Sequence, residues 1–428
     1  MQSVEPVCLT TAMFSFMKVT ENKRRCHMKA WSFLLALSLL ASSVQAQLAV
    51  RADTLYTMAG APIENGVVLI RNGKIEQVGA AQTIRIPEGY RLLEASVVTP
   101  GLIDAHSVVG LAGILNYNHD QDQLDTSDPI QPELRAIDAY NAREKLVEWV
   151  RSFGVTTLHT GHGPGAVISG QTMLVKTRGE TVETALIDSV AAVAATLGPM
   201  VERYFRSPGT RAKAVAMLRA ELLKAQAYRR KLQDADSARR PEPDLGMEML
   251  VRVLDGQIPL LITAQQVPEI MAALRLQREF GFRLILDGAA EAYLVLDEIK
   301  QAGVPVILHP TMVRPRGETV NATLETAARL HEAGIPFAFQ SGFESYVPKT
   351  RVVLFEAAMA VANGLPRMAA LEALTIQAAR LLGIDGRVGS LEPGKDADLV
   401  LFDGDPFEYT THVCGVIIEG ELVHETCR

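Results

Sequence analysis

The sequence predicts an α/β protein in which a TIM-like (β/α)8 barrel carries a small β-sandwich domain composed of both chain ends. Both ends, residues 47–97 and 385–428, are rich in short β-like runs separated by turn residues. The middle, residues 98–384, alternates short apolar strands with amphipathic helices, which is typical of a parallel sheet. The chain of 428 residues is long enough for a barrel of roughly 250 residues and a companion domain.

The N-terminal residues 1–46 have the three-part pattern of a secretory signal peptide. Basic residues between Lys23 and Lys29 precede the apolar run Phe33–Leu40, and small side chains at positions 44 and 46 flank a cut before Gln47. The alternative is a membrane anchor, but the run is shorter than the roughly 20 residues that a membrane-spanning helix needs. Met28 is an alternative first residue of the translated protein. We expect a periplasmic or secreted protein that leaves the membrane after signal cleavage.

Within the first β-rich end, the pair Asn72-Gly73 predicts a hairpin because it lies between two apolar-alternating runs, Val67–Ile70 and Ile75–Val78. The C-terminal end contains a further strand, Ala397–Phe402. The two ends therefore supply the strands of one small domain.

A second hairpin is predicted at the C-terminus, with its turn at Glu419-Gly420. Cys414 and Cys427 flank this hairpin, so its opposed arms would bring the two thiols near each other. A disulfide and two free thiols both stay open, because the strand register is not visible in the sequence.

The middle region contains six candidate barrel strands, which are Val97–Ala105, Val155–His159, Leu260–Thr263, Leu284–Leu286, Val304–Leu308 and Phe337–Phe339. One stretch departs from the alternation of strands and helices. Arg211–Gln233 has a helical apolar stripe and is followed by the polar run Asp234–Asp244. This pattern predicts a helical insertion at about 200–245 with a solvated face.

The net charge of −7, with no long basic block, argues against a nucleic-acid partner. The acidic segment Asn118–Asp128 lacks the glycine and the terminal glutamate of a calcium-binding EF-hand loop. We predict that it is a solvated loop after the first barrel strand.

Several segments resemble those of one enzyme superfamily. Val98–His106 strongly resembles the first barrel strand of amidohydrolases, the superfamily that includes imidazolonepropionase-like and dipeptidase-like enzymes. Gly154–Leu158 resembles the second strand, and Ile168–Gln171 resembles a glycine-containing loop of the imidazolonepropionase-like branch. Gly389–Leu399 resembles the return to the small sheet domain, and the resemblance covers nearly all of residues 48–425.

The resemblance implies a site at the C-terminal ends of the barrel strands, where one or two divalent metals activate water. The family pattern supplies His-x-His after strand one and, in many members, a Lys or Glu around strand four. A His follows each of strands five and six, and an Asp follows strand eight. Imidazoles and carboxylates hold zinc-like ions, and the Asp takes the proton of the water.

Most of these positions are substituted in this chain. His106 matches the first histidine as a vestigial ligand, and Lys176 is a loose candidate for the strand-four bridge. Four positions carry no side chain of the family's ligand or base type, and they are Val108, Thr263, Gly288 and Gly342. Gly342 stands at the position of the general base. Because a catalytic zinc site uses three protein ligands, we expect either no cofactor or a weakly bound divalent metal, zinc if any.

A rearranged pocket is the alternative to loss of the site. Its candidates are His159, His162, His309 and Lys176, with Asp287 and Glu344 at the same barrel mouth. A lone histidine at a strand end, such as His309, is more often a satisfied polar residue than a ligand. His159 and His162 flank a glycine-containing loop, where solvent-exposed polar residues are the alternative to ligands.

Two functions follow from this comparison with the family pattern. The first is an amidohydrolase-like protein with a degenerate metal site, a non-catalytic binding or structural partner of an active relative, or a homo-oligomer. The alternative is a metal-dependent hydrolase of C–N bonds in a small amide, a cyclic amide or a dipeptide, using His106, His159, His162 and His309.

Overall fold

The computed structural model describes residues 47–115, 117–234, 236, 240–313, 315–342 and 352–427. The predicted signal peptide, residues 1–46, and the candidate Glu344 lie outside these residues. No helix in the described ranges combines the length and the apolar character that crossing a membrane requires.

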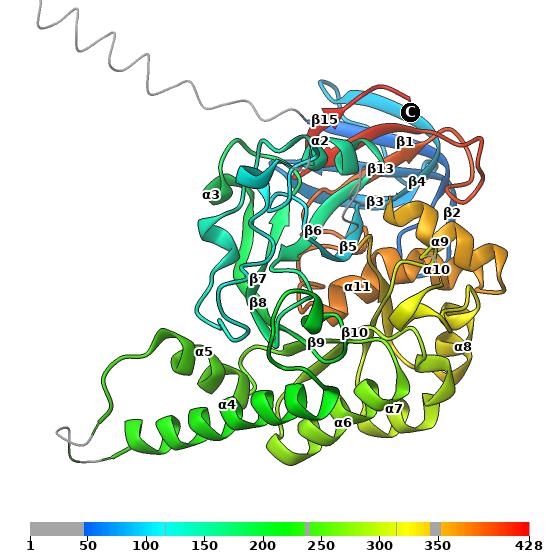
Figure 1. Cartoon of the computed structure of the whole chain (residues 1–428). Helices are drawn as coiled ribbons and strands as arrows, with labels where there is room; N and C mark the ends of the chain where they lie inside the picture. Colours follow the sequence, from blue (N-terminus) through cyan, green and yellow to red (C-terminus); the bar gives the residue numbers. More distant parts are fainter. Residues whose placement is uncertain are drawn as a thin grey trace, which may run out of the picture. The chain divides into compact units, whose positions relative to one another are not determined.

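One sheet joins the two ends of the chain, as the sequence predicts, and its strand order is β15-β14-β13-β4-β1-β2-β3. Figure 1 shows the blue N-terminal strands beside the red C-terminal strands. The antiparallel pair of β4 and β13 connects the two ends. The strands are β1 (Leu48–Leu55), β2 (Ile63–Arg71), β3 (Lys74–Ala80), β4 (Arg91–Pro100), β13 (Leu399–Phe402), β14 (Val413–Ile418) and β15 (Glu421–His424).

Both predicted hairpins are confirmed in this sheet. Asn72 and Gly73 have φ values of 52° and 77°, and Glu419 and Gly420 have values of 49° and 75°. Two successive residues with positive φ suit a two-residue hairpin, because the twist of such a turn matches that of the flanking strands. Cys414 and Cys427 form a disulfide, which decides between the disulfide and the two free thiols that the sequence left open.

A second sheet of eight strands forms the barrel, in the order β12-β11-β10-β9-β8-β7-β6-β5. A parallel bridge between Ser107 and Gly342 joins its two edges, and the Gly342 N–H donates to the His106 carbonyl over 3.3 Å. The predicted barrel is thereby confirmed. Its strands are β5 (Leu102–Ser107), β6 (Val155–Gly161), β7 (Ile168–Lys176), β8 (Leu186–Thr196), β9 (Leu260–Ala264), β10 (Leu284–Gly288), β11 (Val306–Leu308) and β12 (Phe337–Phe339).

Strand β7 runs antiparallel to both of its neighbours, β6 and β8, whereas the other neighbouring strands of the barrel are parallel. The expectation of a loop at Ile168–Gln171 is wrong, because these residues begin β7. The reversed direction places the C-terminal end of β7 beside the N-terminal end of β6, where Lys176 lies opposite Thr157.

Helices pack against the outward-facing apolar side chains of the barrel strands in one large core. Figure 1 shows helix α4 and its neighbour α5 below the barrel strands, and α4 covers the stretch in which the sequence predicts a helix. The helices are α2 (Lys145–Ser152), α3 (Val182–Ala185), α4 (Arg211–Leu232), α5 (Leu245–Leu254), α6 (Val267–Phe280), α7 (Leu296–Ala302), α8 (Thr326–Ala333), α9 (Val353–Ala362), α10 (Arg367–Leu374) and α11 (Ile376–Leu381).

The interior of the barrel is filled by side chains at the N-terminal ends of its strands. Ile103, Leu261 and Ile285 form a buried cluster there with Ala378 and Ala379 of α11. A packed barrel interior of this kind leaves the C-terminal strand ends as the place for polar side chains.

Candidate functional site

Asp287, at the C-terminal end of β10, is the centre of a buried polar network. Its Oδ1 lies 2.9 Å from Nδ1 of His106 and accepts from Nε2 of Gln340 over 2.8 Å. Its Oδ2 accepts from the Thr263 hydroxyl over 2.6 Å. None of the four side chains belongs to a residue more than 5% exposed. The carboxylate is therefore satisfied by three protein donors from three other barrel segments.

The position beside Thr263 on the neighbouring strand is Asp287, whereas Gly288 pairs with Ala264. Side chains alternate between the two faces of a strand, so the neighbours Asp287 and Gly288 cannot both face the barrel interior. The Asp287 carboxylate lies inside the barrel, in keeping with its place among the candidates at the barrel mouth, whereas Gly288, the predicted lost strand-six position, has no side chain.

His106 and Asp287 form an ion pair inside the barrel. Burial lowers the pKa of His106, but the charge and hydrogen bond of Asp287 and the charge of Asp104 outweigh burial and leave that pKa raised. Burial raises the pKa of Asp287, and the charge and hydrogen bonds of its neighbours reverse the shift, so that its pKa is lowered. The imidazolium of His106 thus supplies a positive charge at the strand ends.

His159, on β6, makes two hydrogen bonds and stays neutral. Its Nδ1 donates to the Ala105 carbonyl over 2.6 Å, so its Nε2 accepts from the Thr172 hydroxyl at 2.7 Å. Burial, together with the nearby charge of His106, lowers the pKa of His159 to about 3. A metal ion could bind His159 only by breaking one of these bonds.

His162 and His309 keep ring nitrogens without a partner in the described part of the chain. Both nitrogens of His162 are buried and unpaired, and burial lowers its pKa to about 4. His309 donates from Nδ1 to the Pro310 carbonyl over 2.6 Å, while its Nε2 is unpaired and burial lowers its pKa to about 4. Both are buried, and the expectation of solvent-exposed loop residues is wrong for His162 as it is for His159.

The sequence reasoning missed Asp104, Gln340 and Ser341. Asp104 accepts from the Ser341 N–H over 3.0 Å and also from the Ser341 hydroxyl, which connects β5 to the chain after β12. Burial raises the pKa of Asp104 to about 6. Asp104 lies inside the motif Val98–His106, so its place in the motif was a signal, whereas no sequence signal singled out Gln340 or Ser341.

Three neutral buried histidines predict that acid destabilises the fold. The pKa values of His159, His162 and His309 lie below the ordinary 6.5, so below that pH the unfolded chain binds more protons. Stability should fall from pH 6.5 toward about 4, by at most about 1.4 kcal/mol per pH unit for each histidine. Asp104, Glu144 and Glu318, whose pKa values burial raises, act in the opposite direction, so the net loss should be smaller than the sum over the three histidines.

Urea unfolding at a series of pH values measures this dependence. His162→Gln should make the acid loss shallower, because neither ring nitrogen of His162 has a partner to lose. A free energy of unfolding that is flat between pH 6.5 and 4 would contradict the prediction.

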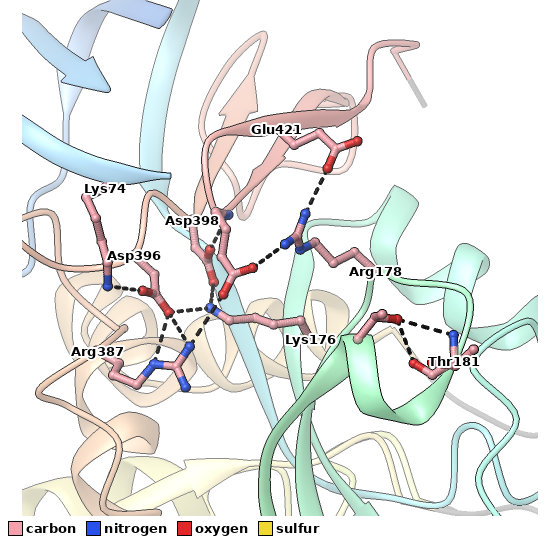
Figure 2. A network of polar contacts seen from close by, with 10 residues as sticks. Lys74, Lys176, Arg178, Thr181, Arg387, Asp396, Asp398 and Glu421 are labelled. Atoms are coloured by element: carbon pink, nitrogen blue, oxygen red, sulfur yellow. Dashed lines mark hydrogen bonds and ion pairs between the residues drawn. The ribbon is translucent and has the colours of Figure 1, made fainter. Parts of the chain in front are cut away.

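Lys176 lies at the other end of the barrel from these histidines. Its Nζ is 2.5 Å from Asp398 Oδ2 and 3.1 Å from Asp396 Oδ2, and Figure 2 shows this network. Asp396 also pairs with Lys74 and Arg387. The expectation of Lys176 as a strand-four bridge or pocket residue is therefore corrected, because the reversed direction of β7 brings it to the small sheet.

A divalent ion does not fit the residues at the C-terminal strand ends. Within the described ranges, no three His, Cys, Asp or Glu side chains gather closely enough to hold a metal. Val108 is buried and apolar. Gly342 has a φ of 66°, and a Cβ added there would lie 2.7 Å from Cγ of Pro310, so an aspartate would be strained and crowded.

Comparison with known proteins was made on the sequence and on the fold. The model of the amidohydrolase family matches residues 289–423. Amidohydrolase tasK of Hapsidospora irregularis is 26% identical over 83% of this chain, which spans 39% of that longer protein. Imidazolonepropionase of Solibacter usitatus is 24% identical, with 86% of this chain and 96% of the enzyme covered.

Among solved structures, the crystal structure of an amidohydrolase from Thermotoga maritima superposes with a TM-score of 0.82 and 29% identity. The alignment covers 88% of this chain and all of that one. These similarities agree with two observations on this chain. One is the motif Val98–His106 in the first barrel strand, and the other is the architecture of a barrel and a small sheet. The chain belongs to the amidohydrolase superfamily.

Proposed function

We propose that this chain is a non-hydrolytic member of the superfamily that acts as a binding or structural protein. The observation that carries the proposal is the network around Asp287. A carboxylate that accepts from His106, Thr263 and Gln340 has its oxygens occupied by protein donors. The charge that a metal ion would supply in the family pattern comes here from the imidazolium of His106.

The position of the lost general base supports the same proposal. A backbone with positive φ at Gly342 and the nearby Pro310 ring suit a residue without a side chain. General acid–base catalysis is worth about 10² to 10⁴ in rate, so a chain without that aspartate loses a large part of the family's catalytic power.

We further propose that the protein works outside the cytoplasm, as a partner of an active relative or as a homo-oligomer. The signal-peptide pattern in residues 1–46 supports export. The disulfide between Cys414 and Cys427 suits an oxidising compartment. The intact barrel and small sheet support a role in which the fold is needed without the hydrolytic chemistry.

The second candidate function is a metal-dependent hydrolase of C–N bonds that acts on an amide, a cyclic amide or a dipeptide. One observation favours it: Nε2 of His106 and Nε2 of His309 are buried without a partner among the described residues. The names of the relatives, an amidohydrolase and an imidazolonepropionase, agree with such a reaction.

The experiment is a metal analysis of the protein expressed with residues 1–46 and purified from the periplasm, followed by hydrolysis assays with added zinc or manganese. We expect less than stoichiometric metal and no turnover of amide, cyclic amide or dipeptide substrates. A pull-down with the tagged protein should recover an amidohydrolase, or sedimentation should show a homo-oligomer.

The matched control is His106→Gln, which removes the one residue that fits the family's first ligand position. Stoichiometric metal and turnover in the natural protein, both abolished by this substitution, would establish the hydrolase instead. Turnover that stays equal in both proteins would indicate a contaminating enzyme and leave the non-hydrolytic assignment standing.

A further inference from the structure

A cavity of about 660 Å³ lies at the N-terminal end of the barrel, away from the histidines. It is bounded by the starts of β10 and β11, by the C-terminal ends of α6 and α7, and by α11. Gln277, Arg283, Gln377 and Arg380 supply its polar side chains. A concave pocket with a few convergent polar groups is the usual form of a small-molecule site.

The charge of this cavity is of one sign. Arg283 and Arg380 are its charged lining residues, and no aspartate or glutamate is among the described residues that line it. Neither guanidinium forms an ion pair or a side-chain hydrogen bond within the described part of the chain. Two unpaired guanidinium groups in one concave surface concentrate positive potential and attract anions.

The ends of α6 and α7 act in the opposite direction, but more weakly. Each helix C-terminus carries about half a negative charge, which two formal positive charges exceed. Both ends are also capped, since the Gly281 N–H donates to the Gln277 carbonyl and the Gly303 N–H donates to the Lys300 carbonyl. Glu392 acts on Arg380 from outside the cavity lining, but Glu392 is itself paired with Lys395, so the net potential at the cavity remains positive.

We propose that this cavity binds a small molecule through a carboxylate or phosphate group. Arg283 and Arg380 hold the anionic group, because a planar guanidinium donates two parallel hydrogen bonds to either acceptor. The half-buried amides of Gln277 and Gln377 donate to the remaining oxygens. This site is separate from the barrel mouth, so it stands independently of the proposed loss of hydrolysis.

Isothermal titration calorimetry tests the site, with succinate and inorganic phosphate as probes at one fixed ionic strength. We expect saturable binding of at least one probe, and the probe that binds tells a carboxylate ligand from a phosphate ligand. The double variant Arg283→Gln/Arg380→Gln should weaken that binding by about tenfold or more, because two charged hydrogen-bond donors are lost.

The matched control is Arg278→Gln, which removes an exposed guanidinium from the same helix as Gln277 but outside the cavity. It should leave the affinity within about twofold of the natural protein, because exposed charges outside the site are screened. Absence of saturable binding with both probes would overturn the proposal, and so would equal weakening in the control. Because Arg283 and Arg380 are exposed, the double variant should keep its thermal unfolding midpoint, which confirms that the fold is intact.

Discussion

Replacing Lys176 with methionine is expected to lower the free energy of unfolding by about 3–5 kcal/mol, the usual cost of removing one partner of a buried ion pair. Lys176 is buried, and so are Asp396 and Asp398, the two carboxylates that it contacts. Methionine keeps most of the aliphatic stem but leaves Asp398 with the Glu419 N–H as its remaining donor. Urea unfolding of the two proteins at neutral pH measures the difference.

The control for this prediction is Lys74→Met, which removes another cation from the same Asp396. The Lys74 side chain is 52% exposed although its Nζ lies 2.6 Å from Asp396, so its loss should cost less than about 1 kcal/mol. Adding Asp398→Asn to Lys176→Met should recover part of the lost stability, because it removes the uncompensated buried charge. Equal losses in the two lysine variants would show that burial does not decide the strength of these pairs.

The network around Lys176 also explains part of the sequence signature Gly389–Leu399. Asp396 and Asp398 belong to that signature, and both contact a barrel residue that is 220 or more positions away. The Asp398 carbonyl further accepts from the Gly101 N–H over 2.8 Å, at the point where the chain passes from the small sheet into the barrel. The signature therefore marks the connection between the two sheets rather than the chemistry of the barrel mouth.

The parts of the fold that depend on local chemistry could be predicted from the sequence. Asn72-Gly73 and Glu419-Gly420 form the predicted turns with positive φ angles, and the charged stretch with an apolar stripe that begins at Arg211 is a helix. Strand β7 could not be predicted in this way. Its direction depends on pairing with β6 and β8, and the local sequence does not record which way a strand runs in its sheet.

The site shows the same limit. His106 was found because it lies in a motif of consecutive residues, whereas the partner of His106 lies 181 positions away on another strand. Side chains alternate along a strand, so Asp287 directs its carboxylate into the barrel beside His106, and this pairing depends on strands that are far apart in the sequence. The sequence placed Asp287 at the barrel mouth, but it did not show that its carboxylate is buried and accepts hydrogen bonds from three other segments.

Replacing Asp287 with alanine is expected to cost about 3–5 kcal/mol of stability, since it leaves the imidazolium of His106 and two hydrogen-bond donors buried without their acceptor. The pKa of His106 should fall in this variant, because the neighbouring charge that raises it is gone and burial then dominates. Nuclear magnetic resonance titration of the histidine ring, together with urea unfolding, measures both effects.

Asp287→Asn and the double variant His106→Gln/Asp287→Asn separate charge from hydrogen bonding. The amide still accepts from Thr263 or Gln340, so the single variant should lose less than alanine does, and the double variant should regain part of that loss if the ion pair carries the coupling. A metal-ligating carboxylate would give the reverse pattern, with little change in the metal-free protein and loss of bound zinc and turnover. Stability measured without metal therefore decides whether Asp287 is the centre of a structural hydrogen-bond network or a metal ligand.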